Sequence, residues 1–368
     1  MKKIFLCTFF VLLYLPQFSQ ESDTTMLSLI FAGDIMGHDE QISGAWDTAT
    51  AAYNYEPTFR YIKPYIEQAD IAIANFEVTL AGPPYRGYPQ FSSPDALAVA
   101  ARDAGFDVFI LANNHAFDRG KAGFVRTLDM LDSLDIIHTG TFKDAESRNL
   151  NYPLILEKNN LRIALLNYTY GTNGIEIPKP FIINRIDTLT IRKDLEKARL
   201  AGPDHTIVTI HWGEEYQRSE NRQQQELARF LLQCGADIII GSHPHVVQPV
   251  QLYLKSDSAL SNIVVYSLGN FVSNQRAQYK DGGIVFEIKL MRTAQGTRVN
   301  EFSYMPSWVY REDLAGKSIF YVLPVSLYEK DNSIIDLKDY DKYKIARFAQ
   351  DTREHLKNIP ENDFWSNE

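Results

Sequence analysis

The stretch LSLIFAGD (Leu27–Asp34) decides the fold: a short, mostly apolar run is followed by a glycine and then by an acid. A run of this length that ends in a turn residue is typical of a buried strand. Similar runs recur along the chain and predict further strands at Ile71–Ala74, Val108–Leu111, Ile163–Leu166, Thr206–Ile210 and Ile238–Ile240.

Helical patterns lie between these strands. One helical face is formed by Phe124, Val125, Leu128 and Leu131. A second helix is predicted at Gln223–Cys234, with Gly235 in the position that commonly ends a helix. Strands and helices in turn indicate an α/β sheet with covered faces. After about Asn274 strands follow one another without helices, which predicts an antiparallel edge or a second sheet from Ile284–Leu290, Phe302–Trp308 and Ile319–Val325.

The N-terminus has the layout of a secretory signal peptide, since Lys2 and Lys3 precede the apolar run Ile4–Leu15 and a polar stretch. The run is short for a transmembrane helix, and no later segment offers ~18 uninterrupted apolar residues. We therefore expect residues 1–20 to direct export to the periplasm or the cell surface. The alternative is an uncleaved N-terminal anchor. Cleavage would leave Cys234 as the one cysteine, so no internal disulfide is expected.

Composition limits the classes of partner and of architecture. The chain has 368 residues, of which 45% are hydrophobic, enough to bury the core of one large domain with or without a smaller extension. Its formal charge of -9 argues against nucleic acid as a partner, because nucleic-acid binding needs a basic surface.

Polar residues stand just after the carboxyl ends of five predicted strands. Ligands of α/β sheets bind at that edge. Each residue alone has an ordinary explanation as a turn, a cap or a hydrogen-bonded structural group. Together they form an unusual set: Asp34, Asn75, Glu77, Asn113, Asn114, His115, His211, His243 and His245.

The chemistry of this set indicates a metal site. Imidazole nitrogens combined with carboxylate and amide oxygens, without a nearby thiolate, suit zinc, iron, manganese or nickel. So many donors favour two ions, and a two-metal site needs a carboxylate that bridges them. Such a site can activate water for attack on phosphorus.

Six motifs in this order closely resemble the CapA capsule-synthesis (poly-γ-glutamate) family. They are FAGDIMGH (Phe31–His38), ANFEVTL (Ala74–Leu80), AGFDVFILANNHAFDRG (Ala104–Gly120), IHWGEEY (Ile210–Tyr216), GADIIIGSHPHVVQP (Gly235–Pro249) and YSLGNFV (Tyr266–Val272). That family looks like a branch of the calcineurin-like metallophosphoesterases. The resemblance implies a two-sheet β-sandwich flanked by helices, with residues 27–275 as its domain. Residues 276–326 would then complete the sheet, and residues 327–368 would form a charged tail that ends in a frayed helix.

The resemblance also implies roles for individual residues. One or two divalent ions (Mn, Zn or Fe) would be held by Asp34, Glu77, Asn114, His211, His243 and His245, with Glu77 in the bridging position. The superfamily's Asp-x-His is absent, because Met36 follows Asp34 by two residues, and His38 becomes an additional candidate ligand.

His115 matches the general acid of the superfamily. Asp118 lies three residues beyond and would orient its ring; the alternative is that Asp118 caps the helix near Lys121. Residues in motifs that face the pocket of the resembling family are candidate substrate contacts, although the aromatic ones are equally explained as core: Trp212, Glu215, Tyr216 and Asn270. His138 and His205 are interpreted as structural.

Three functions follow from this reading. The first is an exported metal-dependent hydrolase that acts on a phosphoester, or a related bond, of an envelope or capsule polymer or its precursor, with peripheral envelope association. The second is a non-catalytic capsule assembly factor that keeps the metal pocket. The third is a metal-dependent amidohydrolase of γ-glutamyl polymer, because such a site also polarises carbonyls.

Overall fold

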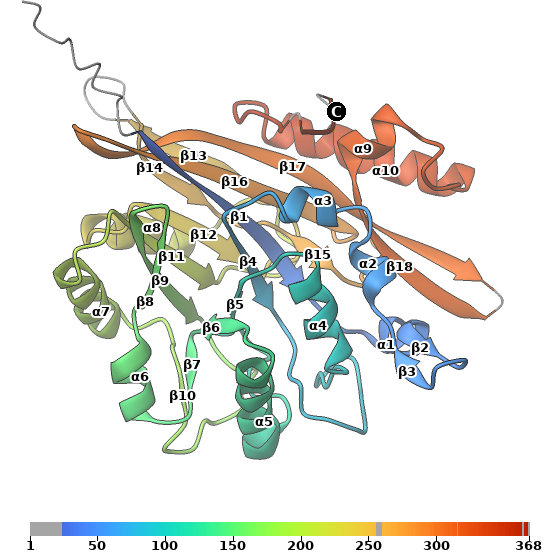
Figure 1. The fold of residues 1–368 in the computed structure, drawn as a ribbon, viewed down its shortest axis with the longest axis horizontal. Helices are drawn as coiled ribbons and strands as arrows, with labels where there is room; N and C mark the ends of the chain where they lie inside the picture. The colour runs from blue at the N-terminus through green and yellow to red at the C-terminus, as the bar shows by residue number, and fades with distance from the viewer. Residues whose placement is uncertain (1–23, 255–259, 315, 363, 367–368) are drawn as a thin grey trace, which may run out of the picture.

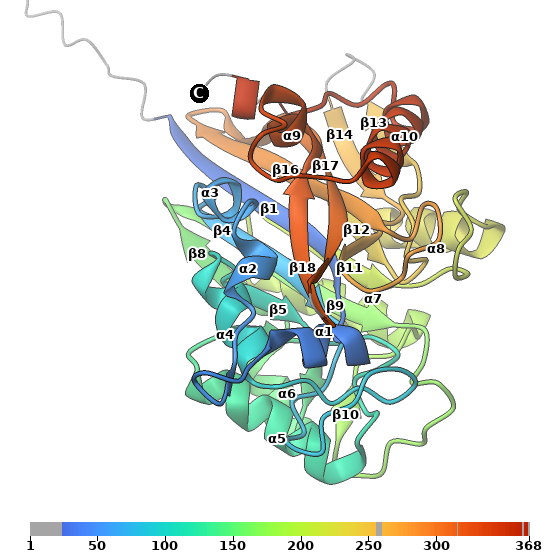
Figure 2. The same ribbon diagram turned by 90° about the vertical axis from the view of Figure 1, so that its right-hand side faces the viewer.

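Two β-sheets lie face to face, and helices cover their outer faces, as Figures 1 and 2 show for the computed structural model. The structure describes residues 24–254, 260–314, 316–362 and 364–366. The prediction of an α/β fold with a two-sheet β-sandwich flanked by helices is confirmed. The predicted signal peptide, residues 1–20, lies outside the described residues. No helix within the described ranges combines the length and the apolar character that crossing a bilayer requires.

The first sheet combines a parallel half with an antiparallel half. Its strand order is β18-β17-β16-β1-β4-β5-β6, with β15 also paired to β1. The parallel strands are β1 (Thr25–Ile35), β4 (Ile71–Phe76), β5 (Val108–Ile110), β6 (Ile137–Thr139) and β15 (Asn270–Val272). The antiparallel strands are β16 (Gly282–Thr293), β17 (Gly296–Leu314) and β18 (Lys317–Pro324). The C-terminal strands thus extend the sheet that β1 begins.

The second sheet has the order β13-β14-β12-β11-β9-β8. Its parallel centre consists of β9 (Leu161–Thr169), β11 (His205–His211), β12 (Ile238–Ser242) and β14 (Leu260–Val265). The edge strands β8 (Leu154–Lys158) and β13 (Val250–Leu254) are antiparallel to their neighbours. Two small ribbons pair β2 (Trp46–Asp47) with β3 (Ala52–Tyr53) and β7 (Thr141–Phe142) with β10 (Ile182–Ile183).

Strand β1 shows why the sandwich forms. Successive side chains of a strand point to opposite faces of its sheet. Leu29 and Phe31 therefore face the core between the two sheets, where they join apolar residues of the second sheet such as Ile207. Ile30 and Ala32 face the outer core, beneath the helices. Both faces of β1 are buried, which is the reason for its mostly apolar run.

Helices cover each outer face. The first sheet carries α2 (Glu56–Phe59), α3 (Lys63–Ile66), α4 (Ala96–Asp103) and α5 (Gly120–Ser133). The second carries α7 (Thr188–Leu200) and α8 (Arg222–Gln233). Shorter helices are α1 (Asp39–Ala45) and α6 (Ala145–Asn151). The predicted helix at Gln223–Cys234 is α8, which begins where the Asn221 side chain accepts a hydrogen bond from the Gln224 amide and ends before Gly235, at a φ of 102°.

The segment expected to be a charged tail is an integral layer of the fold. It forms α9 (Val325–Lys330), α10 (Asp339–His355) and a short 3₁₀ helix, η1 (Phe364–Ser366). Phe348 of α10 packs in a cluster with Trp308 and Tyr310 of β17. The expectation of a frayed end is wrong, because Trp365 is buried in the core of the first sheet.

Candidate metal centre

Asp34 is the second-last residue of β1 and lies at a break in strand register. The pairing of β1 with β4 shifts between Ala32 and Asp34. A Cβ atom on Gly33 would lie 1.9 Å from the Gly269 carbonyl oxygen, so only glycine allows the loop before β15 to approach this closely. The strand pairing therefore shifts at Gly33, and Asp34 is fully buried near the carboxyl end of β1.

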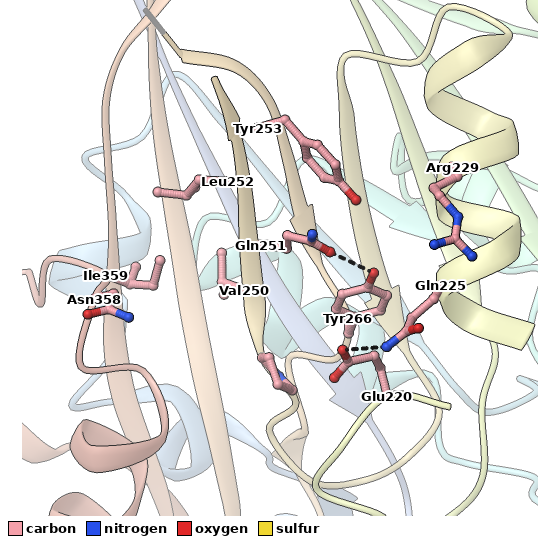
Figure 3. Close-up of a pocket in the computed structure, with 11 residues that line it drawn as sticks. Glu220, Gln225, Arg229, Val250, Gln251, Leu252, Tyr253, Tyr266, Asn358 and Ile359 are labelled. Atoms are coloured by element: carbon pink, nitrogen blue, oxygen red, sulfur yellow. Dashed lines mark hydrogen bonds between the residues drawn. The ribbon is translucent and has the colours of Figure 1, made fainter. Parts of the chain in front are cut away.

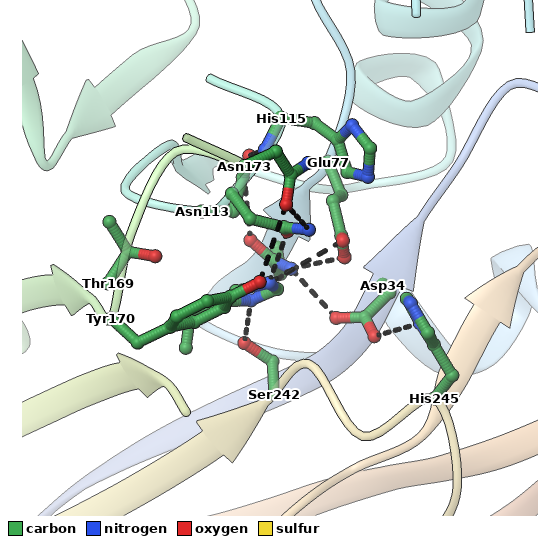
Figure 4. A network of polar contacts seen from close by, with 12 residues as sticks. Asp34, Glu77, Asn113, His115, Thr169, Tyr170, Asn173, Ser242 and His245 are labelled. Atoms are coloured by element: carbon green, nitrogen blue, oxygen red, sulfur yellow. Dashed lines mark hydrogen bonds and ion pairs between the residues drawn. The ribbon is translucent and has the colours of Figure 1, made fainter. Parts of the chain in front are cut away.

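The Asn75 amide lies between two carboxylates (Figure 4). Its Nδ2 donates to Asp34 Oδ1 at 2.7 Å and to Glu77 Oε2 at 3.1 Å. The same nitrogen lies 3.4 Å from His211 Nδ1. Asn75 thus holds together three residues from β1, from the end of β4 and from β11.

Glu77 is fully buried, and burial, reinforced by nearby Asp34, raises its pKa well above the usual range. Its Oε1 atom has no hydrogen-bond partner among the described residues and lies 3.5 Å from His211 Nε2. A buried carboxylate oxygen without a donor is costly unless a cation or a proton satisfies it. Glu77 therefore presents an open ligand atom toward the centre of the site.

His211, the last residue of β11, uses both ring nitrogens. Nε2 lies 2.8 Å from Asn114 Oδ1, and Nδ1 lies 2.9 Å from Ser242 Oγ. Burial lowers the pKa of His211 well below its usual value. A neutral imidazole keeps a lone pair, which is the form that binds metal ions.

His243 and His245 follow β12 in a strained turn. Their φ angles are 100° and 58°, and positive φ in residues other than glycine costs ~1–3 kcal/mol each. Burial, reinforced by His211 and His245, lowers the pKa of His243 to about 2. His243 Nδ1 is buried without a hydrogen-bond partner among the described residues, whereas His245 Nδ1 lies 3.0 Å from Asp34 Oδ2.

These side chains form two groups suited to a metal ion. Asp34, Glu77 and His211 form the first, and Glu215, His243 and His245 form the second; within each group the ligand atoms lie within 4.8 Å of one another. The open atoms of Glu77 and His243, and the mixture of nitrogen and oxygen donors, fit a divalent transition metal. Six of the seven predicted ligands meet here: Asp34, Glu77, Asn114, His211, His243 and His245.

His115 and Asp118 form a buried pair beside this cluster. His115 Nδ1 lies 2.6 Å from Asp118 Oδ2, and that oxygen also accepts a hydrogen bond from the Phe91 amide at 2.8 Å. The Phe91 ring meets the His115 ring edge to face at 4.6 Å. Asp118 thus contacts His115 as expected, and the alternative, that its side chain caps α5, does not hold in this structure: its carboxylate is bonded to His115 and Phe91.

Two predicted site residues lie apart from the donors. Neither donor group found among the described residues includes His38, whose Nδ1 lies 3.0 Å from Gln41 Oε1 and 3.3 Å from the Asn274 amide nitrogen. Trp212 is only 2% exposed, and its Nε1 donates to the Tyr266 carbonyl. Trp212 is therefore a core residue that packs against Tyr266, which agrees with the alternative given for this aromatic residue, and its contact with a substrate stays a prediction.

The other predicted contacts lie at the edge of the site. Asn270 is buried, with Oδ1 3.1 Å from His245 Nδ1. Glu215 is exposed but belongs to the second donor group, so it is a candidate ligand as well as a candidate contact. Tyr216 is 46% exposed, with its ring centroid 6.1 Å from that of His245.

The sequence reasoning missed Tyr170, Asn173 and Ser242. The Tyr170 ring lies 4.5 Å from the His243 ring and parallel to that of His211. Asn173 accepts a hydrogen bond from Asn114 Nδ2 at 3.1 Å. Tyr170 and Asn173 follow the carboxyl end of β9, the same signal that identified the other residues.

Two hollows differ in their relation to this centre. One, of about 540 Å³, is lined by Tyr170, Trp212, Leu227 and Phe230, so it adjoins the donors through the Tyr170 ring. The other, of about 530 Å³, lies between α8 and the edge strand β13, where Tyr266 donates to Gln251 (Figure 3). None of the predicted site residues lines that second hollow.

Comparison with known proteins agrees with this architecture. A family model described as "Bacterial capsule synthesis protein PGA_cap" matches residues 28–275. The capsule biosynthesis protein CapA of Bacillus anthracis is 30% identical over 276 residues, which cover 70% of this chain and 63% of that protein. The chain thus spans less than two thirds of that relative. The PGA biosynthesis protein CapA of Bacillus subtilis (strain 168) is 29% identical over 320 residues, 83% of this chain and 79% of that protein.

Solved structures that align with this chain include a calcineurin-like phosphoesterase and a 5'-nucleotidase, each with a TM-score below 0.5. The calcineurin-like phosphoesterase YfkN from Bacillus subtilis aligns with a TM-score of 0.45 at 14% identity, over 91% of this chain and 99% of that one. A 5'-nucleotidase from Candida albicans SC5314 aligns with a TM-score of 0.44 at 11% identity, over 90% of this chain and 58% of that one.

Proposed function

The chain belongs to the bacterial capsule synthesis protein family, and from this premise we propose that it is an exported, metal-dependent hydrolase of phosphoesters. Its substrate would be a capsule or poly-γ-glutamate polymer, or a precursor of one, and it would act at the periplasmic side or the surface of the envelope. The names of the two Bacillus relatives support the role in capsule synthesis.

The convergence of donors from both sheets is the observation that carries this proposal. Asp34 and Glu77 come from the first sheet, and His211 comes from the second sheet. The open atoms Glu77 Oε1 and His243 Nδ1 are both buried, in a place where an unsatisfied polar atom is costly. An arrangement of this kind is better explained by a bound cation than by stability of the fold.

The described residues suit one or two ions of manganese, zinc or iron. Such ions supply Lewis-acid polarisation of a phosphoryl oxygen and lower the pKa of water. The protein's own contribution is to orient the histidine rings. Ser242 Oγ lies at His211 Nδ1 and orients that ring, and Asn270 Oδ1 lies at His245 Nδ1 and orients the other. The low pKa of His243, a consequence of burial, keeps its imidazole neutral at physiological pH.

His115 is the candidate proton donor. Its Nδ1 donates to the Asp118 carboxylate, which leaves Nε2 to carry the proton that a leaving oxygen needs. Asp118 stabilises the charged imidazolium and is itself held by the Phe91 amide. This pair favours a hydrolase over an assembly factor, because binding a metal alone does not need a buried, oriented histidine beside the donors.

The test separates metal binding from proton transfer. His115→Asn should keep the fold and the metal content while turnover of a phosphoester falls ~10²–10⁴-fold, the usual contribution of a general acid. His243→Asn should lose metal along with activity. His138→Asn is the matched control, since His138 pairs with Asp132 and belongs to neither donor group. Elemental analysis and a panel of phosphoesters give the two readouts.

Two outcomes would contradict the proposal. Absence of stoichiometric metal after reconstitution with manganese or zinc would reject the metal centre. Bound metal with no turnover of phosphoesters would reject the phosphoesterase reading. In that case hydrolysis of γ-glutamyl amides would identify an amidohydrolase, and no hydrolysis at all would favour an assembly factor.

A further inference from the structure

Lys280 places a positive charge on the ring of Tyr216, a neighbour of the donor cluster. Its Nζ atom lies 3.8 Å from the centroid of the Tyr216 ring, a distance typical of a cation–π contact. The Tyr216 ring in turn lies close to the candidate metal centre, because its centroid is 6.1 Å from that of the His245 ring. Lys280 lies outside residues 28–275, the range that the family model matches, and is therefore not part of a family motif.

Both partners are tied to the backbone around the centre. Asn270 donates through Nδ2 to the Lys280 carbonyl oxygen at 2.8 Å, while its Oδ1 lies 3.1 Å from His245 Nδ1. The Tyr216 amide donates to the Pro244 carbonyl oxygen at 2.8 Å, between the two histidines of the turn. Lys280 and Tyr216 are therefore held in place by the residues that would orient the metal ligands.

The charge of Lys280 is not neutralised by an ion pair. Of the ion pairs found among the described residues, none involves Lys280. The neighbouring carboxylate of Asp281 is engaged elsewhere, with Lys344 Nζ at 2.7 Å and Trp308 Nε1 at 3.0 Å. An ammonium group that rests on a ring face keeps hydrogens for an anionic ligand.

The acidic surroundings give such a cation a use in binding an anionic substrate. The donor groups contain three carboxylates, Asp34, Glu77 and Glu215, and the whole chain carries a formal charge of -9. Bound metal ions offset the charge at the reacting group. A second negative charge on the substrate would still meet an acidic protein, and Lys280 is placed to attract it.

We infer that Lys280 and Tyr216 form an anion subsite for a second negatively charged group of the substrate, beside the group that the metal donors hold. The inference rests on the proposed function and narrows its substrate class to phosphoesters that carry another anionic group. That group is a carboxylate or a second phosphoryl group, which share anionic oxygens. A phosphoester with only neutral substituents would not use the subsite.

The experiment compares ligands that differ only in the second charge. Propylphosphonate, 3-phosphonopropionate and propane-1,3-diphosphonate have similar chains, and their C–P bonds are not cleaved by phosphoester hydrolysis. Calorimetry would measure their dissociation constants with the wild type, Lys280→Gln, Lys280→Arg and, as control, Lys193→Gln on the exposed surface of α7. Each protein is measured with and without metal, and its metal content is checked afterwards.

The wild type should bind a doubly charged ligand more tightly than propylphosphonate. Lys280→Gln should reduce this preference roughly 10–100-fold, the range expected for a hydrogen bond to a charged group, while Lys280→Arg and Lys193→Gln keep it. A loss confined to one ligand identifies the second group as a carboxylate or as a phosphoryl group. If Lys280→Gln retains the full preference, or if the wild type has none, the subsite does not exist. Failure to bind metal would contradict the proposed function instead, and the preference would remain measurable in metal-free protein.

Discussion

At the scale of single residues, Asn75 links several members of the donor cluster. Its amide hydrogens face Asp34 Oδ1 and Glu77 Oε2, so a neutral donor separates two buried carboxyl groups. Its own Oδ1 accepts from Asn113 Nδ2 at 3.3 Å. Asn75 therefore organises the cluster whether or not it touches an ion.

Replacing Asn75 by leucine tests this role. Asn75→Leu should lower the free energy of unfolding of the metal-free protein by about 1–3 kcal/mol, because the buried carboxyl oxygens lose their donor. Urea unfolding monitored by circular dichroism gives the value. Asn300→Leu, at an exposed position, is the control and should change stability by less than ~0.5 kcal/mol. Equal effects of the two substitutions would mean that Asn75 is not a structural link.

At the scale of elements, helix α10 matters most among the parts that the sequence reasoning undervalued. One face of the helix is buried against β17 and β18 through Ile345, Phe348 and Ala349. Lys344 of the same helix pairs with Asp281, next to the Lys280 subsite. Helix α10 therefore supports the start of β16, which follows Asp281 and lies beside the candidate metal centre.

Two aromatic residues of α10 allow a matched comparison. Phe348 is 3% exposed, whereas Tyr343 is 63% exposed. Phe348→Ala should destabilise the protein by about 3–5 kcal/mol, since it removes a buried ring and leaves a cavity. Tyr343→Ala should change stability by less than ~0.5 kcal/mol. Thermal and urea unfolding would measure both, and a small loss for Phe348→Ala would show that the helix is dispensable.

At the scale of the whole molecule, the candidate centre belongs to neither sheet alone. Asp34, Glu77 and Asn114 lie at or after the ends of strands of the first sheet, and His211, His243 and His245 lie at or after the ends of strands of the second. The carboxyl ends of both parallel regions meet at one edge, where buried histidines face buried acids. The metal centre therefore depends on the correct packing of the two sheets.

Export is a prediction for the whole chain. The mature protein should begin between about Phe18 and Asp23 and lie outside the cytoplasm, because the run Ile4–Leu15 has the features of a cleaved signal. N-terminal sequencing of the secreted protein measures the cleavage point. Leu12→Arg, which places a charge in the apolar run, should retain the precursor in the cell. Intact Met1 on wild-type protein from a cytoplasmic fraction would overturn the prediction.

The sequence by itself determined the strands and the edge at which the site lies. Apolar runs such as Leu27–Ala32 reflect local burial, and a polar residue directly after a run must stand at the carboxyl end of the strand. That rule needs no knowledge of distant contacts. Six predicted ligands therefore meet in the structure, while the identity of the bound ion and the roles of the residues stay predictions.

Only the tertiary structure decided which side chains touch. Asn75 and Asp34 are 41 residues apart in the chain and make a 2.7 Å contact. Lys280 reaches the Tyr216 ring, Tyr170 packs on His243, and Trp212 turns into the core. The charged segment after Leu327 folds onto β17 and β18 for the same reason. Such contacts depend on how two sheets and their helices pack in space, and no local pattern of apolar and polar residues encodes that packing.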